Sequence, residues 1–345
     1  MGFKRFDPED LVVSNDSITA TVWSNNVPSL GTFHTSSTQT TSNTGQFYYS
    51  VYQTASSDAS SAVQFDIAYC DSKGSGSKYY NPQVTGSSPT RTNYGQYRSL
   101  VLGDENKEFI FGNVTGSYFY ALSIDRARYK EKLLPGMTEI HLETLAGKLS
   151  LIDDSSIQTS VTFTDAGRVY NIVSGSIDNG VRITSNRPAG WTFNSGSYGW
   201  LLPDIGTILL NGKALDANGG VGGIFLQTGR DFDTKNENPR KLYNAISASG
   251  ALGRSFKLNS EETLSSDFVF VRARNSEFNY SENPSYISGS TGEVLFDDFI
   301  DNPISYITTV GMYNDNNELL AVAKLSRPLP KNFTKELLVR VKLDF

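Results

Sequence analysis

The chain has 345 residues and a formal net charge of −6. This acidic balance excludes nucleic acid as the expected partner, because neutralising a phosphate backbone needs a basic face. Charged residues make up only 19% of the chain, and the length favours about two domains, within a range of one to three. The polar residues are mainly Ser, Thr, Asn, Gly and Tyr, which suit strands and loops better than long surface helices.

Cys70 is the single cysteine, so the chain forms no intrachain disulfide and no cysteine-based metal site. The sequence contains no apolar run near the roughly 18 residues of a membrane span. A charged-then-apolar leader is also missing from residues 1–10. We therefore expect a soluble protein made in a reducing cytoplasm.

The first half of the chain predicts an N-terminal arm at residues 1–30 and a β-rich domain at residues 31–150. Residues 46–54 and 62–70 are rich in aromatic and β-branched residues, which favours strands. Apolar and polar side chains alternate in the second of these runs, so one of its faces is predicted to be buried. Two Ser/Thr/Gly-rich stretches are predicted as long loops, residues 30–45 and 73–89.

A basic run lies inside this domain, after residues 94–102, which suit either a short helix or a strand. Four cations alternate with other residues in the run: Arg126, Arg128, Lys130 and Lys132. On a strand they would share one face. One interpretation is a solvated edge strand that is protected by charge from unwanted pairing. The other is a docking strip for an acidic partner protein.

Residues 151–260 are predicted as a second β-rich domain or an insertion with long loops. Residues 205–210 followed by Asn211-Gly212 predict a hairpin, because Asn-Gly favours the type I′ turn. Residues 240–249 predict a helix. Trp191 and Trp200 lie among glycines and serines and are predicted to be in loops.

Residues 261–345 are predicted to complete a β-sandwich-like core, with a closing meander of three strands at 306–313, 318–325 and 337–345. A turn at Asn314 to Asn317 separates the first two strands. The sequence Arg327-Pro-Leu-Pro330 is expected to end the second strand, because proline lacks a backbone donor.

The last strand of the meander alternates with period two. Val339, Val341, Leu343 and Phe345 are therefore predicted to be buried, leaving Arg340 and Lys342 free for a partner. Upstream of the meander, residues 275–284 form a polar-aromatic loop in which Phe278 and Tyr280 are candidate assembly contacts. The fold class expected overall is mainly β, with antiparallel, sandwich-like sheets, long polar loops and one or two short helices.

Residue types that carry catalysis or bind ions are present, but their spacing matches no known site. His34 and His141 are the only histidines, and both are predicted to be structural. The glycines at 219–223 lack the Gly-Lys-Ser/Thr ending of a phosphate loop. Several acidic and amide residues could offer oxygens to calcium or serve as paired carboxylates, again without the required spacing: Asp153, Asp154, Asp231, Asp233, Asn236, Glu237, Asp297 and Asp298. We predict no catalytic residue, no cofactor and no metal.

The C-terminal sequence VGMYNDNNELLAVAKLSRPLPKNFTKELLVRVKLDF resembles the closing segment of structural proteins from tailed bacteriophages. The segments RYKEKLLPG, FTDAGRVYNIVSGS, LLPDIGTILLNGKALD and NSEFNYSENPSY are similar to those of virion proteins from T4-like marine and cyanobacterial phages with contractile tails. This likeness extends from about Tyr94 to the end of the chain. It implies a non-enzymatic tail protein, most closely a baseplate wedge assembly protein, that joins the virion in the host cytoplasm. The implied partners are other virion proteins and further copies of the chain in a symmetric assembly, without nucleic acid or membrane.

Three alternatives to this function remain open at the level of the sequence. One is a tail-fibre-like module that binds a receptor or carbohydrate, with Trp191 and Trp200 as stacking platforms. Another is a virion protein associated with the neck or capsid. A third is a cell-wall-degrading enzyme that uses acidic residues such as Asp153 or Asp231.

Overall fold

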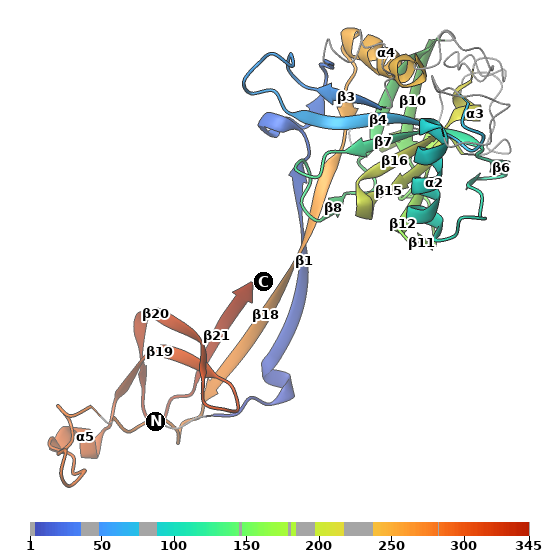
Figure 1. The fold of residues 1–345 in the computed structure, drawn as a ribbon. Coiled ribbons are helices and arrows are strands. Elements are labelled where there is room, and N and C mark those ends of the chain that lie inside the picture. Colours follow the sequence, from blue (N-terminus) through green and yellow to red (C-terminus); the bar gives the residue numbers. More distant parts are fainter. Residues whose placement is uncertain are drawn as a thin grey trace. The chain divides into compact units, whose positions relative to one another are not determined.

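The computed structural model describes residues 4–35, 48–75, 88–144, 147–178, 181–183, 197–216, 237–281 and 283–344. The chain divides into two compact units (Figure 1). Unit 1 comprises Met1–Ser17 and Thr263–Phe345, and unit 2 comprises Ile18–Glu262. Strands β1 (Leu11–Thr21) and β18 (Asn259–Ala273) contribute residues to both units. The prediction of a mainly β protein with antiparallel sheets is confirmed.

Unit 2 is built on one large antiparallel sheet. Its described strands follow the order β2-β17-β9-β10-β12-β15-β16-β7-β4-β3, and β11 pairs with β12. Their bounds are β2 Ser29–Leu30, β3 Tyr48–Tyr52, β4 Val63–Asp71, β7 Tyr118–Ile124, β9 Glu139–Thr144, β10 Gly147–Asp153, β11 Thr162–Thr164, β12 Gly167–Ser174, β15 Gly199–Leu202, β16 Thr207–Asn211 and β17 Phe256–Lys257. The predicted segments 31–150 and 151–260 both supply strands to this sheet.

Short strands accompany the large sheet of unit 2. Strands β5 and β6 form one separate two-stranded sheet, and β13 and β14 form another. Strand β8 pairs with the unit 2 end of β18 through Leu133 and Lys132. The bounds of these strands are β5 Ile110–Phe111, β6 Val114–Thr115, β8 Lys132–Leu133, β13 Ser176–Asp178 and β14 Val181–Ile183.

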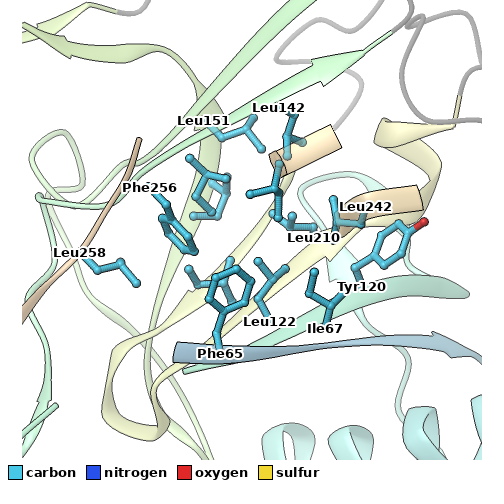
Figure 2. Packing of buried hydrophobic residues seen from close by; sticks show 14 of the residues in the cluster. Phe65, Ile67, Tyr120, Leu122, Leu142, Leu151, Leu210, Leu242, Phe256 and Leu258 are labelled. Atoms are coloured by element: carbon cyan, nitrogen blue, oxygen red, sulfur yellow. The ribbon is translucent and has the colours of Figure 1, made fainter. Parts of the chain in front are cut away.

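Both faces of the large sheet bury apolar side chains. Strand β7 shows this directly, since Tyr120 and Leu122 belong to one core cluster while Phe119 and Ala121 belong to another. Figure 2 shows the first cluster, to which helix α4 (Glu237–Ala251) adds Leu242. Burying each large apolar side chain of this kind contributes roughly 1.5–3 kcal/mol. The alternation predicted for residues 62–70 is confirmed in β4, where apolar side chains point into the first cluster.

Helix α2 (Pro89–Leu102) supplies Tyr94 and Val101 to the second cluster and decides the ambiguous residues 94–102 in favour of a helix. The Ser88 side chain accepts a hydrogen bond from the Arg91 N–H at its start, and Gly103 ends it with φ 63°. The expectation of one or two short helices is too low, because α2 and α4 have 14 and 15 residues and two shorter helices accompany them. The remaining bounds are α3 Gly212–Leu215 and α5 Asp297–Asp301, with single 3₁₀ turns at Pro8–Asp10, Ser24–Asn26 and Pro203–Ile205.

The hairpin turn predicted at Asn211-Gly212 is wrong. The buried Asn211 side chain accepts a hydrogen bond from the Lys213 N–H at 3.1 Å and caps helix α3, while its amide group donates to the Ser197 carbonyl at 3.2 Å. Asparagine suits both a type I′ turn and a helix N-cap. Here Asn211 is buried, and capping helix α3 gives its side-chain oxygen the hydrogen-bond partner that a buried polar group requires.

Unit 1 packs a strand hairpin against a second sheet. The second sheet has the order β1-β18-β21, and the hairpin consists of β19 (Ser305–Tyr313) and β20 (Leu319–Lys331). Val269, Val339 and Val341 from the sheet share one small core with Met312 from the hairpin. The hairpin and the second sheet therefore pack against each other around a small core within this unit.

Two details of the closing meander were predicted wrongly. Strand β20 does not end at the prolines, because Pro330 pairs with Tyr306 after an irregularity in the register. Proline is tolerated here since a strand of a two-stranded sheet has a free edge, where the missing N–H is not needed. Strand β21 (Leu337–Asp344) pairs with β18 and not with β20. The burial predicted for Val339 and Val341 is confirmed, Leu343 is half-buried, and Phe345 lies outside the described residues.

Two hairpins of the unit 2 sheet share the sequence Thr-x-Ala-Gly at their turns. The hydroxyl groups of Thr144 and Thr164 donate to the carbonyls of Gly147 and Gly167, at 2.8 and 3.3 Å. Both glycines have φ near 100°. They differ in surroundings, because a Cβ on Gly167 would lie 2.3 Å from Asp204 Oδ2, whereas a Cβ on Gly147 would meet no atom of the described residues within 4 Å.

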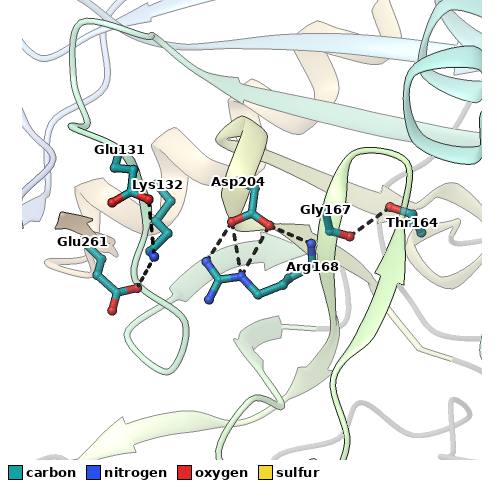
Figure 3. A network of polar contacts seen from close by, with 7 residues as sticks. All are labelled: Glu131, Lys132, Thr164, Gly167, Arg168, Asp204 and Glu261. Carbon is teal, nitrogen blue, oxygen red and sulfur yellow. Dashed lines mark hydrogen bonds and ion pairs between the residues drawn. The ribbon is translucent and has the colours of Figure 1, made fainter. Parts of the chain in front are cut away.

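We predict that Gly167→Ala destabilises unit 2 more than Gly147→Ala does. Both changes force an L-residue into a left-handed conformation at a cost of roughly 1–2 kcal/mol. The Gly167 variant also displaces Asp204, which accepts hydrogen bonds from the Arg168 N–H and guanidinium at 2.7 Å each (Figure 3), adding roughly 1–3 kcal/mol. Denaturant unfolding followed by tryptophan fluorescence reports on unit 2, because Trp23, Trp191 and Trp200 all belong to it. An equal decrease in the free energy of unfolding of the two variants would contradict the prediction.

Candidate functional site

Unit 1 carries most of the large apolar side chains that are exposed in the described chain, although it is the smaller unit. The outer face of the β19–β20 hairpin is one centre of this surface. Val310, Met312 and Ala321 point into the small core, whereas Leu320 and Val322 on the other face are 68% and 57% exposed. Successive side chains of a strand point to opposite faces, so these apolar residues of the hairpin lie on both of its faces. The second sheet covers only the inner face.

Strand β1 is the second centre. It lies at the edge of the sheet β1-β18-β21, and none of its residues is buried. Leu11, Val12 and Val13 are consecutive, so they point to both faces, and each is about half exposed. Within the part of the chain that the structure describes, β1 and β21 each have one edge that is not paired in this sheet.

The segment around helix α5 adds a third group of exposed apolar residues. Tyr286 packs its ring against Phe296 and Phe299, at centroid distances of 5.9 and 5.6 Å. Leu295 and Ile300 remain exposed next to them. The full set of exposed large apolar residues in unit 1, here called the apolar surface, is Phe6, Leu11, Val12, Val13, Phe278, Tyr280, Tyr286, Leu295, Phe296, Ile300, Ile304, Tyr306, Tyr313, Leu319, Leu320, Val322, Phe333 and Leu338.

Two candidate contacts from the polar-aromatic loop, Phe278 and Tyr280, belong to this apolar surface. Arg340 and Lys342 are exposed on β21, as predicted, and their charged groups lie over the Phe268 ring at 5.4 and 5.8 Å from its centroid. Lys342 also pairs with Asp344 at 2.8 Å. These cations therefore line the face of the sheet that points away from the small core.

The basic run does not form the predicted strand face. Residues 126–128 form a turn, in which Asp125 accepts hydrogen bonds from the N–H groups of Ala127 and Arg128, and only Lys132 lies in a strand. Aspartate accepts readily from the N–H groups that follow it, which favours a turn here over the strand that the alternation suggested.

Most cations of the run bind neighbouring groups of unit 2. Arg126 lies over the Tyr129 ring at 4.8 Å, and Arg128 donates to the hydroxyl of Ser24. Lys132 lies between Glu131 and Glu261, at 3.6 and 3.9 Å (Figure 3). Lys130 is exposed. Arg126 is exposed as well, so the docking strip stays a prediction at these two positions.

A buried polar chain in unit 2 was missed by the sequence reasoning. His141 Nδ1 lies 2.8 Å from Ser150 Oγ, and His141 Nε2 lies 3.3 Å from Glu139 Oε1. Glu139 Oε2 accepts a hydrogen bond from Lys257 Nζ at 2.7 Å. The strands β9 and β10 align Ser150 with His141 directly. The alternation of Glu139, His141 and Glu143 was the available signal, but the register of the hairpin was needed to bring Ser150 into contact.

The order serine, histidine, glutamate matches that of a base-activated nucleophile. However, Ser150 is only 2% exposed and lies in the middle of a strand. A substrate carbonyl must come within about 3–3.5 Å of such an oxygen, and this burial blocks that approach. The arrangement therefore satisfies buried polar groups, as buried groups require.

Other residues considered from the sequence also have structural partners. Asp153 is buried and accepts hydrogen bonds from the N–H groups of Gly136, Thr138 and Ser155. Trp200, which was expected in a loop, lies in β15 and packs against Phe111 at 5.1 Å. Several candidates lie outside the described residues: Trp191, the glycines at 219–223, Asp231, Asp233 and Asn236.

Comparisons with known proteins identify no relative. No family model, curated protein or solved structure matches the chain. Among the described residues, no three His, Cys, Asp or Glu side chains group as ligands for a metal ion. None of the helices in those ranges combines the length and apolar character needed to cross a bilayer.

Unit 2 should lose stability in acid through Glu139. Burial raises the pKa of this carboxyl, but hydrogen bonds and charge from His141 and Lys257 outweigh burial and lower the pKa from 4.5 to about 2. A group whose pKa is lower in the folded state stabilises above its unfolded pKa. The contribution, roughly 3 kcal/mol, is therefore present above pH 4.5 and is lost as the pH falls toward 2.

We predict that Glu139→Gln lowers the stability of unit 2 at neutral pH and flattens its dependence between about pH 4.5 and pH 2. The measurement is the denaturation midpoint by tryptophan fluorescence across this range. The exposed Glu105→Gln serves as the control, since it should keep the profile of the unmodified chain. If the denaturation midpoint of Glu139→Gln fell with pH as it does in the unmodified chain, the Glu139 carboxylate would not be the cause of the acid dependence.

Proposed function

We propose that the chain is a non-enzymatic structural component of a contractile phage tail, and specifically an assembly protein of the baseplate wedge. The observation that carries this proposal is the apolar surface of unit 1. Exposed apolar side chains that gather on one part of a protein, in contrast to single ones scattered over it, mark sites of association. An assembly protein has use for such a surface, because assembly buries it.

The chemistry of this surface fits a protein interface. On the hairpin, the exposed Val322 lies opposite Gly311, and the exposed Leu319 lies opposite Tyr313. Interface cores are depleted in charge and enriched in aromatic residues. Leu320 and Val322 are uncharged, and Tyr313 adds an exposed aromatic ring, whereas Lys324 is a charged residue in the middle of the hairpin, opposite Thr309.

Free strand edges offer a second means of association. A neighbouring chain adds a strand to an exposed edge through main-chain hydrogen bonds. Native monomers usually protect such edges by charge or by covering them. Along β1, residues Leu11 to Val13 carry no charge, and no other part of the described chain buries them. This supports the pairing of the β1 edge with a strand of another virion protein or of another copy.

The phage tail as the particular assembly follows from the resemblance of the C-terminal and upstream segments to virion proteins. The proposed partners are other tail and baseplate proteins, with several copies of this chain in a symmetric particle. Nucleic acid and membrane have no part in the proposal. The place of action is the virion, after assembly in the host cytoplasm.

We predict that the double variant Leu320→Thr, Val322→Thr folds normally but enters particles poorly. Threonine keeps β propensity and removes apolar area from a face that the chain itself leaves exposed. Incorporation is measured by mass spectrometry of purified particles from a host that supplies the variant, with circular dichroism as the check on folding. Ile157→Thr, Val161→Thr in unit 2 is the matched control, because both residues are also exposed. Normal incorporation of the unit 1 variant would count against this surface.

Electron microscopy tests the location separately. Particles that lack the protein should have defective baseplates, and a label on the chain should appear at the baseplate. Intact tails with normal baseplates in its absence would overturn the proposed function.

A further inference from the structure

Lys331 is a fully buried lysine in unit 1. It is the last residue of β20, and its side chain is among the largest that are fully buried in the described chain. Its Nζ donates to the carbonyls of Asn275 and Asn332, at 2.9 and 2.8 Å, and to the side-chain Oδ1 of Asn279 at 2.8 Å. All three of these acceptors are neutral amide oxygens.

This environment is unfavourable for a permanent charge. A buried ammonium is costly unless an opposite charge compensates it at close range. Burial lowers the pKa of Lys331, against the more distant attraction of Glu277 and Glu336. The Glu277 carboxylate itself bonds the Arg274 N–H at 2.9 Å and Lys4 Nζ at 3.3 Å. A lower pKa increases the fraction of lysine that is an uncharged, nucleophilic amine.

The loop that faces Lys331 reverses the usual distribution of polar and apolar residues. Asn279 is 8% exposed, while its neighbours Phe278 and Tyr280 are 42% and 53% exposed. Phe278 has a φ of 58°, which is uncommon for a bulky residue. The Asn279 amide nitrogen donates to the Asn275 carbonyl at 2.6 Å. The loop thus holds the carboxamide of Asn279 in a fixed orientation against the amine of Lys331.

We propose that Lys331 and Asn279 are the site of an intramolecular isopeptide bond. The amine nitrogen of Lys331 attacks Cγ of Asn279, a C–N bond forms, and the bond from Cγ to Nδ2 breaks. The attacking nitrogen gives one of its two protons to the leaving nitrogen, which departs as ammonia. The ammonia takes up the proton that the lysine ammonium had given up, so the products are a neutral amide and an ammonium ion. No oxidation or reduction occurs, and no co-reactant is consumed.

The product suits the site better than the reactants do. A neutral amide replaces an ammonium that lacks a carboxylate partner in contact, so the cost of burying charge is removed. The bond also ties the end of β20 to the loop after β18, across 52 positions of the chain. A covalent link of this kind restricts the unfolded chain, as a disulfide does. Its formation is independent of the proposed function.

The test is the intact mass of the purified full chain under denaturing conditions, after incubation of the folded protein. The expected mass is lower than the sequence mass by one ammonia molecule. A protease digest should contain a branched peptide that joins the segments around Asn279 and Lys331. A full sequence mass in the unmodified protein overturns the proposal, whatever the particle experiments show.

Variants separate this bond from other losses of ammonia. Asparagine can lose ammonia by forming a succinimide, for which Asn211-Gly212 is a candidate sequence. Lys331→Arg and Asn279→Ala should each restore the full mass, whereas Lys324→Arg, at an exposed lysine of the same strand, should keep the deficit. A deficit that persists in Lys331→Arg would assign the loss to another site and overturn the proposal.

Discussion

The structure depends on how each sheet covers its apolar faces. A strand has two faces, and a sheet is stable in water when an apolar face packs against another layer. In unit 2 the large sheet meets this constraint on both sides, since α4 covers one face and α2 the other. Strand β7 can therefore be apolar along most of its length, which is the pattern of a strand buried on both faces.

Unit 1 meets the same constraint only in part. Its hairpin and its sheet cover one face of each other, and the core between them is small. No helix of the described chain supplies that core, and the outer face of the hairpin retains Leu320 and Val322. The two units thus use their apolar residues differently. Unit 2 buries most of them in its two cores, whereas unit 1 leaves many of them exposed.

The sequence predicted well where local pattern and burial agree. Alternation located β4 and β21, because each packs apolar side chains against a core on one face. It failed where one pattern suits two structures. Asn211-Gly212 suits a turn and a helix cap, and the alternating cations at 126–132 suit a strand and a turn stabilised by Asp125. The pairing of β21 with β18 was beyond local pattern, because no feature of residues 337–345 specifies a partner strand earlier in the chain.

The residues missed by sequence reasoning are buried polar groups. Ser150 and His141 are separated by a hairpin turn, and Asn279 and Lys331 by 52 positions, so their contacts exist only after folding. Buried polar groups require partners, and the two cases meet this requirement differently. In unit 2 the carboxylate of Glu139 balances the cation of Lys257 and bonds His141. In unit 1 the three oxygens that accept hydrogen bonds from the Lys331 ammonium are all neutral. A buried ammonium without a carboxylate in contact is costly, and the proposed reaction with the adjacent carboxamide of Asn279 would replace it by a neutral amide at the same place.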